Sequence, residues 1–229
     1  MTSHRIRIVD SFDQLIATPF GGNVNALCWR RQLPGDFLEV IDRLQAGAGM
    51  TTIEDDDLRA LTLSPAGSRA REVLLADQAL LRGHGLAPSL DCITGYARDA
   101  AVGPVPTDVY SFHVDRAPVP MDTYLCTYAG PASEGLPNEA AIRRIDIAET
   151  RARLLDIYGG PDDAAFRAYL SEQSFDLHYW PRPGATPYFF GTGNLWRIAI
   201  AYPDAPVLPC IHRAPTTLPG DPARLLLIS

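Results

Sequence analysis

Two residues of metal-binding types stand two positions apart in the segment Ser111-Phe112-His113-Val114-Asp115. Side chains along a β-strand point alternately to its two faces. If this segment ends a strand, His113 and Asp115 share one face, and Phe112 and Val114 point to the other. An imidazole and a carboxylate side by side are two adjacent ligands for a divalent cation. The segment therefore predicts part of a metal site.

The C-terminal part of the chain offers a third ligand and a charged neighbour. His212 lies in Cys210-Ile211-His212-Arg213-Ala214-Pro215, which is another expected strand end. Arg224 directly precedes the apolar run Leu-Leu-Leu-Ile, so we expect it on a buried strand. A buried guanidinium is unfavourable unless an anion accompanies it. Because arginine binds carboxylates through two parallel hydrogen bonds, a ligand carboxylate is a natural partner.

This order of residues, H-x-D followed by a distal histidine and then an arginine, resembles the iron(II)/2-oxoglutarate dioxygenase superfamily. The resemblance covers roughly Val109 to the C-terminus. It implies a double-stranded β-helix, which is a cupin-like jelly roll. It also implies that iron(II) is held by the catalytic triad His113, Asp115 and His212, and that Arg224 binds the distal carboxylate of 2-oxoglutarate.

The same resemblance implies oxidation of an unknown small-molecule substrate with 2-oxoglutarate and O2. Three ligands on one face of iron leave three positions open for the co-substrate and O2. Thr123 and Tyr124 are expected to line the co-substrate pocket, although such residues in strands also serve packing. The sequence departs from the family at Leu226, where the family often has Ser or Thr. Zinc or nickel could occupy the site in place of iron.

A second resemblance points to a metal-linked role without fixing a reaction. The chain is similar to an uncharacterised, cupin-like bacterial family whose genes are often associated with zinc homeostasis. The segments that carry this similarity are 112–115, 125–131, 136–137 and 212–215. The alternative function is therefore a non-catalytic metal-binding protein in zinc or iron homeostasis. A cupin isomerase or dioxygenase that needs no 2-oxoglutarate is a third hypothesis.

The same residues also have structural interpretations. The three expected metal ligands could form hydrogen bonds within a packed core. Arg224 could pair with a carboxylate of the protein, such as Asp221 or Glu134. His178 could be a fourth ligand, although packing is its simpler interpretation.

Periodicity and capping residues predict the elements that position these side chains. Asp36 can cap a helix over 37–45, and Ser68 can cap a second helix that runs to Leu81. A third, short helix is expected at 162–172. After Pro106 the chain becomes rich in β-branched and aromatic residues, as strands are. Strands are expected at 109–113, 123–128, 141–147, 188–190, 195–201, 207–212 and 224–228.

These elements indicate a mainly β, α+β fold in one domain over residues 1–229. A helical and mixed N-terminal part, 1–105, is expected to pack its helices on a double-stranded β-helix core over 106–229. A domain boundary near 103–106 is the weaker alternative. A chain of 229 residues with 46% hydrophobic residues can bury a sizeable core without disulfides.

Charge and cysteine usage narrow the expected partners and compartment. The net charge of -7 opposes nucleic-acid binding, despite a local group of arginines at positions 143, 144, 151 and 153. No apolar run reaches the ~20 residues that span a bilayer, and the N-terminus lacks the apolar core of a signal peptide. The four scattered cysteines are expected to be free thiols. We therefore expect a cytoplasmic protein with a small-molecule substrate, and a homo-oligomer is compatible with the sequence.

Overall fold

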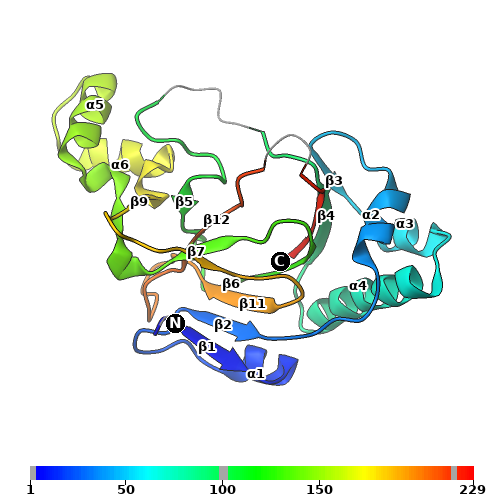
Figure 1. Ribbon diagram of the computed structural model, residues 1–229. Helices are drawn as coiled ribbons and strands as arrows, with labels where there is room; N and C mark the ends of the chain where they lie inside the picture. Colours follow the sequence, from blue (N-terminus) through cyan, green and yellow to red (C-terminus); the bar gives the residue numbers. More distant parts are fainter. Residues whose placement is uncertain (1–3, 98–102, 218–220) are drawn as a thin grey trace.

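The computed structural model describes residues 4–97, 103–217 and 221–229. It is an α+β fold, as the sequence predicted, with two sheets at its centre (Figure 1). Helices α2, α3 and α4 lie on one side of the sheets, and α5 and α6 stand apart from them on the other side. Within the described residues, none of the helices combines the length and apolar character that crossing a bilayer requires.

The larger sheet contains seven strands from both halves of the chain. Only the pair β1 and β2 is parallel, and every other neighbouring pair is antiparallel. The order across the sheet is β1 (Ile6–Val9), β2 (Ala26–Trp29), β11 (Leu195–Ala199), β6 (Asp122–Ala129), β13 (Arg224–Ile228), β4 (Ser89–Ile93) and β3 (Met50–Thr52).

The smaller sheet contains six antiparallel strands. From β4 onwards the chain passes repeatedly between the two sheets: β4, β6, β11 and β13 lie in the larger sheet, and β5, β7, β10 and β12 lie in the smaller. The order across the smaller sheet is β10 (Tyr188–Phe189), β7 (Glu134–Leu136), β12 (Ile211–Arg213), β5 (Phe112–His113), β9 (His178–Pro181) and β8 (Ala141–Arg143).

The strands of the larger sheet present different chemistry on their two faces. On β13, Leu225 and Leu227 are buried in the core that the helices cover, whereas Leu226 belongs to the cluster between the sheets. Arg224 stands two positions before Leu226, so both side chains point to the same face of β13, and both line one cavity. The period of two along a strand therefore directs Arg224 toward the interior between the sheets.

The helices begin at recognisable capping residues. The Asp36 carboxylate accepts hydrogen bonds from the backbone N–H groups of Leu38 and Glu39, so the predicted cap is confirmed. The second helix starts earlier than predicted, because Ser64 rather than Ser68 caps it and Pro65 fits its first turn. The helices are α1 (Phe12–Ala17), α2 (Phe37–Leu44), α3 (Asp55–Ala60), α4 (Pro65–Gly83), α5 (Ala148–Tyr158) and α6 (Ala164–Glu172), with 3-10 turns at Asn138–Ala140, Arg144–Asp146 and Phe175–Leu177.

Several expectations about the elements need correction; the expected strands at 109–113 and 207–212, for example, begin only at Phe112 and Ile211. The N-terminal part does more than pack helices on the core, because its strands β1 to β4 belong to the larger sheet. The predicted strand at 141–147 ends after Arg143, where the chain turns into a 3-10 helix. Helix α5 was not predicted, and no side chain caps its N-terminus. All four cysteines are free and buried, as expected.

A buried ion pair ties helix α4 to the outer face of the larger sheet. Arg31, which follows β2, donates to Asp77 of α4 over 2.7 Å, and both side chains are more than nine-tenths buried. The Tyr128 hydroxyl of β6 donates to the other oxygen of the same carboxylate, also over 2.7 Å. One carboxylate therefore joins two strands and a helix.

Replacing Asp77 with Ala should destabilise the protein by about 3–5 kcal/mol, because it leaves Arg31 buried without its counter-charge. Urea unfolding followed by circular dichroism measures the change. Asp146→Ala is the control, since its ion pair with Arg143 is half exposed and should contribute less than about 1 kcal/mol. Equal losses in the two variants would contradict this account.

Candidate metal centre

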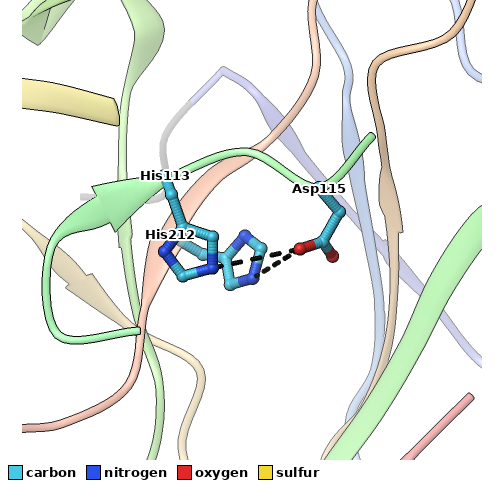
Figure 2. Close-up of side chains that lie close together, drawn as sticks. All are labelled: His113, Asp115 and His212. Atoms are coloured by element: carbon cyan, nitrogen blue, oxygen red, sulfur yellow. Dashed lines mark ion pairs between the residues drawn. The ribbon is translucent and has the colours of Figure 1, made fainter. Parts of the chain in front are cut away.

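Three side chains from two neighbouring strands converge at one end of the smaller sheet. His113 on β5 lies directly opposite His212 on β12 in the antiparallel register. Asp115 follows β5 and faces both rings (Figure 2). Its Oδ1 atom lies 3.9 Å from His113 Nε2 and 3.8 Å from His212 Nε2. One donor atom from each residue falls within 4.8 Å of the others, so the structure brings all three predicted ligands together.

Backbone carbonyl groups fix which nitrogen of each histidine is available. His113 Nδ1 lies 2.8 Å from the carbonyl oxygen of Ser111, and His212 Nδ1 lies 3.3 Å from that of Cys210. A carbonyl oxygen can only accept a hydrogen bond, so each Nδ1 carries the proton. In the neutral ring each Nε2 then carries the lone pair and faces Asp115, which is the tautomer that metal-binding histidines adopt.

The Asp115 carboxylate is oriented by a neighbouring strand. The Thr123 hydroxyl on β6 donates to Asp115 Oδ2 over 2.7 Å and leaves Oδ1 toward the histidines. Burial opposes ionisation of Asp115, but the charge of His212 and the Thr123 hydrogen bond prevail and lower its pKa. Burial, together with the charge of His212, lowers the pKa of His113 to about 4. At neutral pH the site therefore offers a neutral His113 and an ionised Asp115, as metal coordination requires.

The donor set fits a divalent metal ion. Two imidazole nitrogens and one carboxylate oxygen are the facial set of non-haem iron(II) sites, and zinc accepts similar sets. Ligand atoms bound to one ion at about 2.1 Å lie roughly 3 Å apart when adjacent. The separations of 3.8 and 3.9 Å to Asp115 are slightly larger, so a bound ion would draw the side chains together.

Arg224 carries a buried charge with hydroxyl partners only. Its side chain is almost fully buried, and it donates to Tyr96 Oη (3.0 Å), Thr127 Oγ1 (3.0 Å) and Ser133 Oγ (2.6 Å). Its buried Nε has no hydrogen-bond partner, and among the described residues it forms no ion pair. Burial lowers the pKa of Arg224 because it disfavours the charged form. Glu134, one of the partners considered for it, binds Arg213 instead.

A cavity of about 190 Å³ connects Arg224 with the three candidate ligands. Asp91 also lines it, and its carboxylate already accepts hydrogen bonds from Thr52 (2.7 Å) and Ser89 (3.0 Å). Ser133 and Tyr96 are its hydroxyl-bearing residues near the arginine. Most other lining side chains are apolar: Met50, Ile93, Val109, Leu125, Ala214, Leu226 and Ile228.

A second, more open pocket of about 410 Å³ approaches the same centre from outside. His113 and Asp115 line both spaces, so a metal ion held by them would lie between the two. The outer pocket is completed by residues before β5, by Arg116 and by the segment that follows α6. His178 lines this pocket from β9, and its ring centre lies 5.8 Å from that of His113, outside the three-ligand group.

The structure corrects one predicted pocket residue and changes the role of another. Tyr124 does not line the cavity, because it lies on the opposite face of β6 in the core beneath the helices. Thr123 faces the centre, but its hydroxyl donates to Asp115, and its side chain does not line the cavity that contains Arg224. Thr127 was missed, although it has the same parity as Thr123 on β6. Tyr96 and Ser133 lie outside the predicted strands, and no local signal marked them.

Comparisons with known proteins leave this geometry to be interpreted on its own. No protein-family model, no curated protein and no solved structure matches the chain.

Replacing Thr123 with Val should weaken metal binding roughly tenfold or more, because Asp115 loses the hydrogen bond that orients it. Titration of the metal-free protein with zinc(II) or iron(II) in a calorimeter measures the affinity. Thr51→Val makes the same change on β3, away from the triad, and should leave the affinity unchanged. An unchanged affinity in Thr123→Val would show that Asp115 is not held for metal binding.

Proposed function

We propose that this protein is a non-haem iron(II)- and 2-oxoglutarate-dependent oxygenase that acts on a small-molecule substrate. One observation carries the proposal. The buried Arg224, which has no carboxylate partner among the described residues, and a His-Asp-His cluster line one cavity. An anion that also binds the metal would satisfy both the guanidinium and the ion.

The chemistry of the cavity favours a dicarboxylate with a 2-oxo group. The guanidinium and the hydroxyls of Tyr96, Thr127 and Ser133 can bind one carboxylate through charge-assisted hydrogen bonds. The apolar side chains that line the same cavity suit a short methylene chain. The oxo and carboxylate oxygens at the other end are ligands for iron(II). The family that the sequence resembles often has Ser or Thr at the position of Leu226. Here the hydroxyls of Tyr96, Thr127 and Ser133 provide the polar groups beside the arginine.

The strand order supports the double-stranded β-helix that this function implies. The larger sheet contains the run β4-β13-β6-β11, and the smaller sheet contains β5-β12-β7-β10. These eight strands, taken in chain order, form two facing antiparallel sheets joined by crossing connections, as jelly rolls do. On this interpretation the candidate ligands lie at the ends of β5 and β12, and Arg224 lies at the start of β13.

Each residue of the centre then has a defined task. The Nε2 atoms of His113 and His212 and Oδ1 of Asp115 hold the ion, while the backbone carbonyls and Thr123 keep these donors aligned. When bound, iron(II) lets O2 convert 2-oxoglutarate to succinate and CO2 while one oxygen atom enters the substrate. Arg224 positions the co-substrate in the inner cavity. The substrate then binds in the outer pocket.

Anaerobic titration of the metal-free protein with iron(II) and then 2-oxoglutarate tests the centre. We expect the weak visible charge-transfer band of chelated 2-oxoglutarate, and we expect His113→Ala to abolish it by removing a ligand. Metal binding without the band would instead support a metal storage or sensing protein, which the same donor set would serve. The absence of metal binding would show that the triad is structural.

The variant Arg224→Met separates a ligand-binding arginine from a structural one. Removing a buried, unpaired cation should leave the melting temperature of the ligand-free protein unchanged or higher. The affinity for 2-oxoglutarate should fall at least tenfold, because charge-assisted hydrogen bonds are lost. Differential scanning calorimetry and the charge-transfer titration measure the two effects.

Arg144→Met is the matched control. Like Arg224, Arg144 has a buried Nε without a hydrogen-bond partner, but its side chain is only partly buried, stacks on Trp180 and lies outside the cavity. Its replacement should leave 2-oxoglutarate affinity unchanged. A large loss of stability in Arg224→Met with unaltered affinity would assign Arg224 to the fold alone.

A further inference from the structure

An apolar groove of about 570 Å³ adjoins the outer pocket. Its walls are Ala117, Pro118, Ala201, Tyr202 and Pro203, and two polar residues, Arg116 and Ser171, complete it. The volume lies in the range of small-molecule sites. We call this surface the apolar groove.

The apolar groove begins next to the candidate metal ligand Asp115. The backbone N–H of Ala201 donates to the carbonyl oxygen of Asp115 over 2.8 Å, and the N–H of Ala117 donates to that of Ala201 over 2.9 Å. Arg116 lines both the outer pocket and the groove. The two spaces therefore share the Arg116 side chain in their walls.

The electrostatics of the groove favour an uncharged occupant. Arg116 is the one charged residue among the described residues that line it. Its guanidinium already donates to the hydroxyl and carbonyl oxygens of Ser171, both over 2.8 Å, and to Asp176 over 3.1 Å. An ionic group in the groove would lose its hydration and find no free counter-charge, whereas an apolar group would gain by leaving water.

We propose that the substrate carries an uncharged aliphatic or aromatic part that lies in the apolar groove while its reacting carbon lies in the outer pocket beside His113 and Asp115. The reaction rests on the proposed function, but occupation of the groove requires neither iron nor 2-oxoglutarate. The proposed substrate is thus an elongated, partly apolar small molecule rather than a compact polar metabolite.

Binding of 1-butanol, 1-hexanol and 1-octanol, followed by ligand-detected NMR, tests the proposal. Affinity should rise about twofold to fourfold per added methylene while the chain stays within the groove. In a second measurement, manganese(II) replaces zinc(II) at the triad. The alcohol resonances should broaden with manganese relative to zinc, because a probe in the groove lies close to the paramagnetic ion. Binding without this broadening would place the probe elsewhere and overturn the proposal.

Two aromatic variants identify the surface that binds the probe. Tyr202→Ser removes one wall of the groove and should weaken 1-octanol binding at least threefold. Phe189→Ser removes an exposed aromatic side chain of β10 that does not line the groove, so it should have no effect. Equal effects of the two variants, or an affinity independent of chain length, would overturn the proposal.

The remaining outcomes separate this inference from the proposed function. If neither manganese(II) nor zinc(II) binds, the proposed metal centre is wrong, and the contrast between Tyr202→Ser and Phe189→Ser still tests the groove in metal-free protein. If light scattering shows a dimer that Tyr202→Ser dissociates, a second copy of the chain occupies the groove, and the inference is wrong.

Discussion

The register between β5 and β12 determines the candidate centre. One antiparallel pairing, His212 opposite His113, brings two imidazoles from distant parts of the chain to one carboxylate. A slip of one residue would turn His212 to the other face of the sheet. The neighbours Phe112 and Ile211 resist such a slip, because both are buried in the apolar cluster of the smaller sheet. Apolar packing on one face thus fixes the polar geometry on the other.

The larger sheet also separates its side chains between two faces, but several residues on its inner face are polar. The inner positions of β6 include Thr123 and Thr127, and β13 begins with Arg224, where most buried strands would place apolar side chains. Buried polar groups destabilise a fold unless they are hydrogen-bonded. Thr123 binds Asp115, and Thr127 accepts a hydrogen bond from Arg224. Arg224 forms hydrogen bonds with three hydroxyl groups but no ion pair with a described residue, so its charge has no carboxylate in direct contact.

The residues found from the sequence were those marked by local patterns. His113 and Asp115 follow from strand alternation, and Arg224 follows from the apolar run after it. Alternation also shows why Tyr124 was assigned wrongly, since it cannot share an inner face with its neighbour Thr123. Tyr96 and Ser133 reach Arg224 through pairings between distant segments, which no local pattern records.

The same limit explains the errors in the fold. Strands β1, β2 and β3 have three or four residues each, and β3 has no fully buried residue, so their patterns are weak. They become strands because neighbouring strands provide hydrogen-bond partners. β2 pairs with β11, which lies more than half the chain away. Long, capped or strongly patterned elements such as α2 and β6 were predictable, because the information that defines them is local.

The cavity that contains Arg224 and the outer pocket beside the triad bear on the choice between an oxygenase and a metal storage or sensing protein. A protein that only stores or senses a metal ion needs three ligands and their supporting hydrogen bonds. It does not need a buried cation in the same cavity as the triad, nor an outer pocket that adjoins an apolar groove. An oxygenase needs both, because its co-substrate and substrate must approach one ion from different sides. We propose catalysis rather than storage because His113 and Asp115 line both of these spaces.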